Sequence, residues 1–157
     1  MTDISKPSGP TAITLQQTLP QPTQELASAA VPVGTRILPF GPDHPKFAEW
    51  LFASEETATR DPDQFIQAPF NLVAWVAKAV ELPDQETGET IRAARLVLID
   101  DHGETVSFAS IGAVSSLDLL RHLWGDGPYD PARPVVFKRE KTRLGRQLWR
   151  IRPHKLS

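Results

Sequence analysis

Between residues 71 and 152 the chain is a succession of short strand-like segments separated by turn signals. Five such segments, rich in β-branched, aliphatic or aromatic residues, lie at residues 71–82, 91–100, 104–112, 134–140 and 146–152. The second and third flank a short turn that ends at Gly103, a residue that can take a positive φ. The fourth and fifth flank a turn at residues 141–145. This pattern predicts a mainly β protein containing two hairpins.

One helical segment interrupts these strands. Residues 117–125 place Leu117, Leu120 and Trp124 on one face, with Ser115 and Ser116 as candidate N-caps before them. The predicted order is therefore three strands, a helix and two strands. A five-stranded OB-like barrel, with its helix between strands 3 and 4, has this order. SH3-like barrels and open α+β sheets are the alternative folds.

The part of the chain before residue 71 has a different character. Residues 1–32 are rich in Pro, Thr, Gln and Ser, contain no aromatic residue and show no sustained period, so they predict a flexible N-terminal arm. After a short extended piece at residues 36–40, Phe47, Trp50 and Leu51 form one helical stripe. We expect this stripe to pack on the core. Residues 33–157 are thus predicted to be one OB-like domain with an N-terminal helical extension.

Composition excludes several classes of site. The chain has no cysteine, which rules out disulfides, thiolate catalysis and cysteine-based metal sites. Its four histidines lack metal-ligand spacing, and no phosphate loop or nucleophile elbow occurs, so we expect neither an enzyme nor a cofactor or metal. No apolar run approaches the roughly 20 residues of a membrane helix, and the N-terminus does not resemble a secretory signal. We expect a soluble protein of the cytoplasm, or of the host cytoplasm if viral.

Charge is distributed unevenly along the chain. The net charge is −2, but from residue 132 onward nine cations accompany one carboxylate, Glu140, so this part carries +8 and the rest −10. Such asymmetry is typical of a basic surface that meets a polyanion. The alternative is a solvated strand edge that is kept basic against aggregation.

Cations and aromatic rings together suggest a binder of single-stranded nucleic acid, because cations follow the phosphates and rings stack on bases. The turn residues Lys141, Arg143 and Arg146 are the strongest candidates, since OB domains commonly bind oligonucleotides with this loop. Strand alternation leaves open whether the aromatics stack on bases or fill the core. The predicted nucleic-acid-binding residues are Trp75, Phe108, Arg133, Phe137, Lys138, Arg139, Lys141, Arg143, Arg146, Trp149, Arg150 and Arg152.

Several short patterns recur between residues 71 and 152: a Thr-Gly-Glu loop at 87–89, a Leu-Ile-Asp-x-x-Gly-Glu turn at 98–104, a Phe-x-Ser strand end at 108–110, a Ser-Leu helix and a Gly-Arg turn at 145–146. In these the chain resembles phage-encoded single-stranded DNA-binding proteins with an OB-like core. The resemblance implies a strand-protecting role in replication, with the last hairpin as the basic region. Cellular single-strand binders commonly end in an acidic tail, whereas this chain ends in Pro-His-Lys-Leu-Ser.

Two functions of different classes are therefore carried forward. The first is binding of single-stranded DNA with little sequence specificity during replication of a phage or mobile element, with RNA as an alternative polymer and replication proteins as further partners. The second is a protein-interaction module of a virion or replication complex that does not itself bind nucleic acid. The sequence does not determine the oligomeric state.

Overall fold

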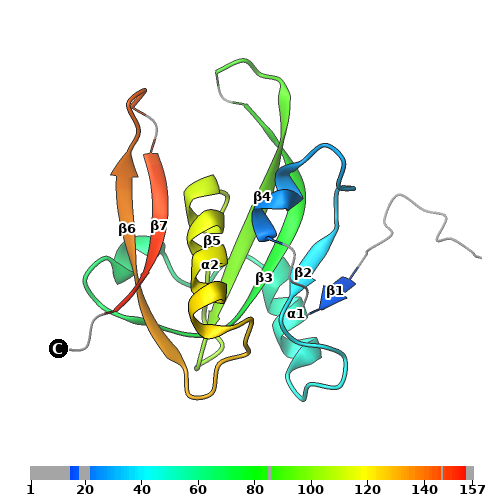
Figure 1. Cartoon of the computed structure of the whole chain (residues 1–157), viewed down its shortest axis with the longest axis vertical. Coiled ribbons are helices and arrows are strands. Elements are labelled where there is room, and N and C mark those ends of the chain that lie inside the picture. Colours follow the sequence, from blue (N-terminus) through cyan, green and yellow to red (C-terminus); the bar gives the residue numbers. More distant parts are fainter. Residues whose placement is uncertain (1–14, 18–21, 85, 146, 155–157) are drawn as a thin grey trace, which may run out of the picture.

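The computed structural model describes residues 15–17, 22–84, 86–145 and 147–154 (Figure 1). Within them seven strands accompany two α-helices and two 3₁₀ helices. In chain order the elements are β1 (Leu15–Gln17), η1 (Thr23–Ala27), β2 (Arg36–Leu38), α1 (Phe47–Glu55), η2 (Pro62–Phe65), β3 (Phe70–Pro83), β4 (Thr90–Asp100), β5 (Thr105–Phe108), α2 (Ile111–Trp124), β6 (Arg133–Lys141) and β7 (Gln147–Pro153).

Strand β3 is the centre of the sheet. It has 14 residues, and one of its edges pairs with β4, from Leu72 opposite Asp100 to Pro83 opposite Thr90. The other edge is divided, because its start pairs with β6 and its middle, at Ala77 and Lys78, pairs with β2. Strand β5 adds to β4, and β7 adds to β6. Strands β2 to β7 thus form a six-stranded antiparallel sheet, to which β1 adds in parallel beside β2.

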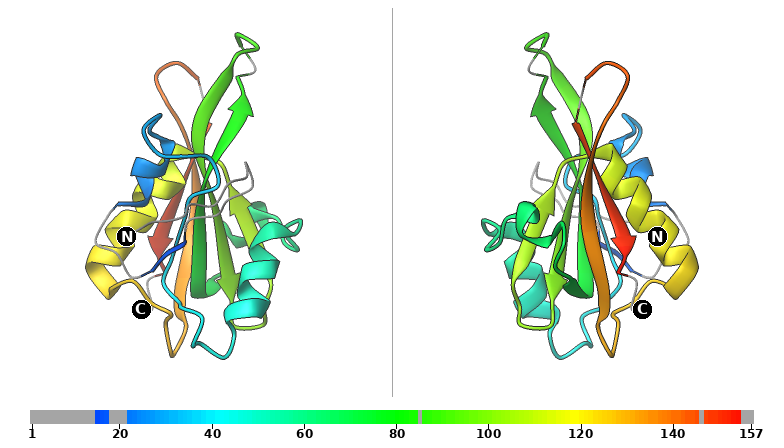
Figure 2. Two further views of the ribbon diagram at one scale, coloured as in Figure 1. Left: turned by 90° about the vertical axis from the view of Figure 1, so that its right-hand side faces the viewer. Right: turned by 90° about the vertical axis from the view of Figure 1, so that its left-hand side faces the viewer.

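Both faces of the central strands are covered. Figure 2 shows α2 on one side of the sheet and α1 on the other. Trp75 and Leu98 belong to the main core on the α2 side, whereas Ala74 and Ile99 pack with Trp50 of α1 on the opposite side. Burial of both faces explains why residues 71–80 read as a nearly continuous apolar run instead of an alternation.

The sheet is not closed into a barrel. Among the described residues, β5 and β7 form no ladder with each other. Helix α2 lies against β7, where the Trp149 N–H donates to Ser110 Oγ at 3.1 Å and a Cβ added to Gly112 would lie 2.6 Å from the Trp149 carbonyl oxygen. On the other side, the Arg60 N–H donates to the Thr105 carbonyl of β5 at 2.9 Å. Helix α2 therefore contacts β7, and the loop at Arg60 contacts β5, where a closed barrel would pair these strands with others.

The prediction of a mainly β protein is confirmed, whereas the predicted five-stranded closure is absent from the described sheet. The helix position also needs correction. Helix α2 begins at Ile111, with Ser110 as its N-cap residue, so the predicted caps Ser115 and Ser116 lie inside the helix. The Ser110 hydroxyl accepts a hydrogen bond from β7. Counted along the whole sheet, α2 follows the fifth strand, since β1 and β2 precede those that form the predicted five.

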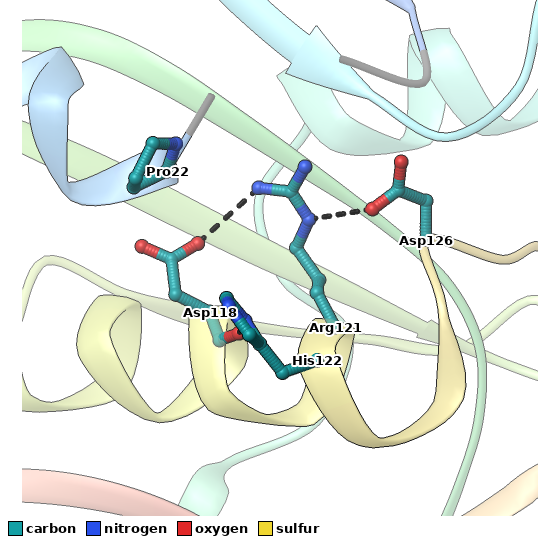
Figure 3. Close-up of a pocket in the computed structure, with 5 residues that line it drawn as sticks. All are labelled: Pro22, Asp118, Arg121, His122 and Asp126. Carbon is teal, nitrogen blue, oxygen red and sulfur yellow. Dashed lines mark hydrogen bonds and ion pairs between the residues drawn. The ribbon is translucent and has the colours of Figure 1, made fainter. Parts of the chain in front are cut away.

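The carboxylate of Asp118 on α2 binds the start of η1 through hydrogen bonds. Asp118 accepts hydrogen bonds from the Thr23 N–H at 2.8 Å, the Thr23 hydroxyl at 2.7 Å and the Gln24 N–H at 3.1 Å. Arg121 lies beside it, with Nη1 3.3 Å from Asp118 and Nε 2.8 Å from Asp126 (Figure 3). A pocket of about 240 Å³ lies at this cluster, and its charged lining residues, Asp118, Arg121 and Asp126, already bond to one another.

The predicted arm at residues 1–32 is wrong for the part that the structure describes. Leu26 of η1 is fully buried in the main core, and residues 22–32 follow the outside of α2 and β4. Residues 1–14 and 18–21 of the predicted arm lie outside the described residues. Sequence pattern missed this docking because a single leucine in a five-residue 3₁₀ helix has no period.

Candidate nucleic-acid interface

The hairpin of β6 and β7 has an inner and an outer face. Val135, Phe137 and Ile151 point inward and are buried, as alternation along each strand requires. Lys138 and Arg150 lie directly opposite each other and point outward. The outer side thus carries Lys138, Arg150 and Arg152, with Glu140 among them, whereas Arg139 lies on the inner side opposite Trp149.

Three cations of the outer face and turn are exposed. The turn is closed by the Gly145 N–H, which donates to the Thr142 carbonyl at 3.0 Å, and Gly145 has a φ of 82° that favours glycine. Lys138, Lys141 and Arg143 lie on or beside it. In the described part of the chain, no carboxylate lies within ion-pair distance of these three. Their positive charge is therefore not locally neutralised.

The carboxylate of Glu140 contacts the two other cations of the outer face, Arg150 and Arg152. Glu140 accepts from Arg150 Nε at 3.2 Å and lies 3.8 Å from Arg152 Nη2. Because one negative charge faces two guanidinium groups, this part of the hairpin keeps an excess positive charge. Arg146, which we predicted to belong to the site, lies outside the described residues.

Two predicted phosphate contacts are engaged within the protein. The guanidinium carbon of Arg139 lies 5.0 Å from the centre of the Trp149 ring, and Arg139 also forms an ion pair with Asp63. Arg133 lies 5.3 Å from the centre of the Trp124 ring. These contacts hold both arginines against the body of the protein. Contact of the hairpin with phosphates would therefore depend on the remaining cations.

Three of the predicted base-stacking residues are core residues. Trp75 is 1% exposed and its Nε1–H donates to the Asp126 carbonyl at 2.9 Å, while Phe108 and Phe137 pack edge to face at 5.1 Å between ring centres. Burial leaves no ring face on which a base can stack, which corrects their assignment to the site. Trp149 differs, since it is only partly buried and lies 5.7 Å from Phe108.

Tyr129, the aromatic residue of the proline-rich connector, is also buried. Its hydroxyl donates to the Gly125 carbonyl at 2.6 Å, and its ring lies edge-on to Trp124 at 5.9 Å. Burial, reinforced by the nearby charge of Asp126, raises the pKa of Tyr129 to about 12. Tyr129 therefore orders the connector, and its buried ring offers no face on which a base can stack.

An acidic groove of about 550 Å³ was not predicted from the sequence. It lies where the β4–β5 turn, the α2–β6 connector and the start of α1 meet, at the end of the molecule opposite the β6–β7 turn (Figure 1). His44 and Trp50 lie 4.7 Å apart between ring centres, and Lys46 is its one lining cation among the described residues. The carboxylates that line it are Glu49, Asp100, Asp101 and Asp130. This charge disfavours phosphate.

A second cluster of cations lies where β2, β3 and β4 adjoin. Arg36, Lys78 and Arg95 occupy paired positions on these three strands. Arg36 is buried and forms an ion pair with Glu55, and Lys78 Nζ lies 3.2 Å from the same carboxylate. Burial acts to raise the pKa of Glu55, but the hydrogen bonds and charges of Arg36 and Lys78 outweigh it and lower the pKa. Glu55 neutralises one of the three positive charges, and the Arg95 Nε–H donates to the Ser107 hydroxyl at 3.1 Å, so this cluster also keeps an excess positive charge among the described residues.

Comparisons of the chain with protein-family models, with curated proteins and with solved structures each found no match. Over the described residues, no helix combines the length and apolar character that crossing a membrane requires. The same residues contain no group of three or more His, Asp or Glu side chains that could hold a metal ion. The candidate site therefore rests on the hairpin itself.

Proposed function

We propose that the protein binds single-stranded nucleic acid, foremost DNA, through the outer face and turn of the β6–β7 hairpin. The observation that carries the proposal is the exposure of Lys138, Lys141 and Arg143 with no described carboxylate in ion-pair distance. Arg150 and Arg152 extend the same surface beyond Glu140. A polyanion gains most where cations lack such partners, because binding then breaks no existing ion pair.

Binding of this kind is directed to phosphates and not to bases. Cations that neutralise phosphates release condensed counterions, and the resulting affinity is independent of sequence. Trp75, Phe108 and Phe137 are core residues, and Trp149 lies on the inner side of the hairpin with Ile151, so the outer face carries none of the predicted aromatic rings. We therefore infer little sequence preference and a strong dependence of affinity on salt.

The preference for single strands and the biological role rest on resemblance. The patterns shared with phage-encoded single-stranded DNA-binding proteins support protection of single strands during replication of a phage or mobile element, with replication proteins as further partners. Among the predicted aromatics, Trp149 alone is partly exposed, but Arg139 and Phe108 already contact its ring, so the preference for an unpaired strand does not rest on stacking.

The test is a titration of the full chain with fluorescein-labelled dT oligonucleotides, followed by anisotropy at several salt concentrations. We expect tighter binding to the single strand than to a duplex of equal length, and a matched U oligonucleotide gives the preference between DNA and RNA. Each phosphate contact to a single strand contributes about −0.7 to the slope of log affinity against log salt. Replacing Lys138, Lys141 and Arg143 by Ala should therefore flatten that slope by about 2.

Thermal unfolding of the triple variant serves as the control for folding. Substitutions of exposed side chains usually change stability by no more than about 0.5 kcal/mol each, so the melting temperature should change little. A folded triple variant with an unaltered salt slope would remove this hairpin from the interface. Equal affinity for single strand and duplex would reduce the hairpin to a general basic surface.

A further inference from the structure

Helix α2 has an apolar side that nothing in the described structure covers. Leu119 and Leu123, one turn apart, are 71% and 63% exposed, whereas Leu117 and Leu120 of the same helix are buried in the core. An amphipathic helix on the surface of a protein normally presents polar residues on the side away from the core. The second apolar side of α2 therefore contributes nothing to the core and is available to a ligand.

These leucines border a groove between α2 and β7. Helix and strand touch at Gly112, where an added Cβ would lie 2.6 Å from the Trp149 carbonyl oxygen. Farther along the helix, Leu120 and Ile151 line the groove together with the exposed leucines. Its volume is about 240 Å³. Since a cavity of about 150 Å³ holds a benzene ring, the groove has room for one large or two smaller apolar side chains.

The charge along the groove is positive. Arg150 and Arg152 line its β7 side, and no carboxylate lines it among the described residues. The carboxylate that bonds to these arginines, Glu140, faces both of them at once. The groove thus combines apolar walls with a net positive margin. Its complement is a segment with apolar side chains on one side and carboxylates beside them.

We propose that this groove docks an acidic amphipathic segment of a partner protein. Residues 116–123 of α2 border it over a length of about 11 Å at the helical rise of 1.5 Å per residue, so about two turns of a partner helix fit. Leucine or phenylalanine of that segment enters between Leu119, Leu123 and Ile151. Aspartate or glutamate of the same segment meets Arg150 and Arg152. The proposal adds a protein ligand to the proposed binding of nucleic acid.

The probe is a fluorescein-labelled 14-residue peptide with leucine or phenylalanine at every third or fourth position and aspartate or glutamate between them. Fluorescence anisotropy with the full chain measures its binding. The variant that carries Leu119→Ser and Leu123→Ser together should bind the peptide at least about tenfold more weakly, because two apolar contacts are lost. The matched control is Phe52→Ser on α1, which removes a side chain that is 69% exposed on the opposite side of the sheet.

A second probe separates charge from apolarity. A peptide with lysine in place of each acidic residue should not bind. Arg152→Gln should weaken the binding of the acidic peptide and reduce the dependence of that binding on salt. The leucine variant should keep the affinity of the unsubstituted protein for the dT oligonucleotide, because neither leucine belongs to the proposed nucleic-acid surface. This result keeps failure of the groove proposal distinct from failure of the proposed function.

Three outcomes would overturn the proposal. The first is no binding of the acidic peptide, or binding that the leucine variant and the Phe52 control share. The second is a sedimentation experiment in which the unsubstituted chain dimerises and the leucine variant does not, which would assign the groove to a second copy. The third is leucine-dependent binding to vesicles of anionic lipid in the absence of peptide binding, which would assign it to a membrane surface.

Discussion

At the scale of single residues, Phe137 and Lys138 show how one strand serves two purposes. Phe137 is buried beside Phe108, and Lys138 is exposed on the opposite face. We expect Phe137→Ala to lower the free energy of unfolding by about 3–5 kcal/mol, because it leaves a cavity. Lys138→Ala should leave stability unchanged within about 0.5 kcal/mol and reduce the slope of log affinity against log salt by about 0.7.

Urea denaturation and the dT titration together measure both effects. Lys46→Ala is the control for Lys138→Ala, since it also removes an exposed positive charge, one that pairs with Glu49 beside the acidic groove. It should change neither stability nor the salt slope. A Phe137→Ala variant of normal stability and reduced affinity would instead place Phe137 among the base-stacking residues.

Glu55 makes stability depend on pH in the acidic range. Arg36 and Lys78 hold the pKa of Glu55 below its usual 4.5, although partial burial of this side chain acts to raise it. A carboxyl group with a lowered pKa stabilises the fold at pH values above its unfolded pKa, and this contribution is lost as the pH falls through the folded pKa. Glu55→Gln should cost about 1 kcal/mol at pH 7, a small value because water screens part of the carboxylate.

The measurement is urea denaturation of both proteins between pH 7 and pH 3. The difference in unfolding free energy should be constant at neutral pH and shrink as the pH falls below about 4.5. Glu56→Gln is the control, because its exposed carboxylate has no ion pair among the described residues. A difference that stays constant down to pH 3 would show that Glu55 does not carry this dependence.

At the scale of elements, the position of α2 depends on the absence of one side chain. Gly112 allows the helix to approach β7 so closely that an added Cβ would meet the Trp149 carbonyl oxygen at 2.6 Å. Gly112→Ala should lower the free energy of unfolding by about 1–3 kcal/mol, although alanine favours helices by about 1 kcal/mol. Ser115→Ala, farther along α2, should change it by less than about 0.5 kcal/mol. Urea denaturation measures both, and a stabilised Gly112→Ala variant would contradict the contact.

Local elements were predictable where their pattern is local. Residues 91–100 are rich in aliphatic side chains and are followed by a glycine turn, and β4 occupies Thr90–Asp100. The stripe of Phe47, Trp50 and Leu51 predicted a helix, and all three residues lie in α1, which ends at Glu55. Burial of both sides of β3 made its faces indistinguishable by sequence, so the role of Trp75 could not be decided.

The site was predictable in charge but not in stacking. The run of cations at residues 133–152 located the hairpin, because charge requires no knowledge of the fold. Which cations are engaged depends on partners far along the chain, as with Asp63 for Arg139. The acidic groove escaped prediction for the same reason, since three separate segments build it.

At the scale of the whole molecule, the N-terminal segment is part of the core. Removal of residues 1–32 takes away Leu26, which is fully buried, and the backbone N–H groups that bond to Asp118. Loss of a buried leucine costs about 2–5 kcal/mol, so the melting temperature should fall by about 4–20 °C. Differential scanning calorimetry measures the change. Leu26→Ala in the full chain should account for most of it, and an unchanged melting temperature after truncation would return this segment to a flexible arm.

The central position of β3 also bears on how fast the molecule folds. Its ladder with β6 joins Leu72 to Arg133, 61 positions apart, whereas the β3–β4 and β6–β7 pairs are each joined by a short turn. Isolated hairpins form in about 1–10 microseconds, but closing a long loop costs entropy before any contact repays it. We therefore expect the docking of the two hairpins to limit the folding rate. Substitutions at Phe70 or Leu72 should slow refolding, whereas those in the β6–β7 turn should act mainly on other steps.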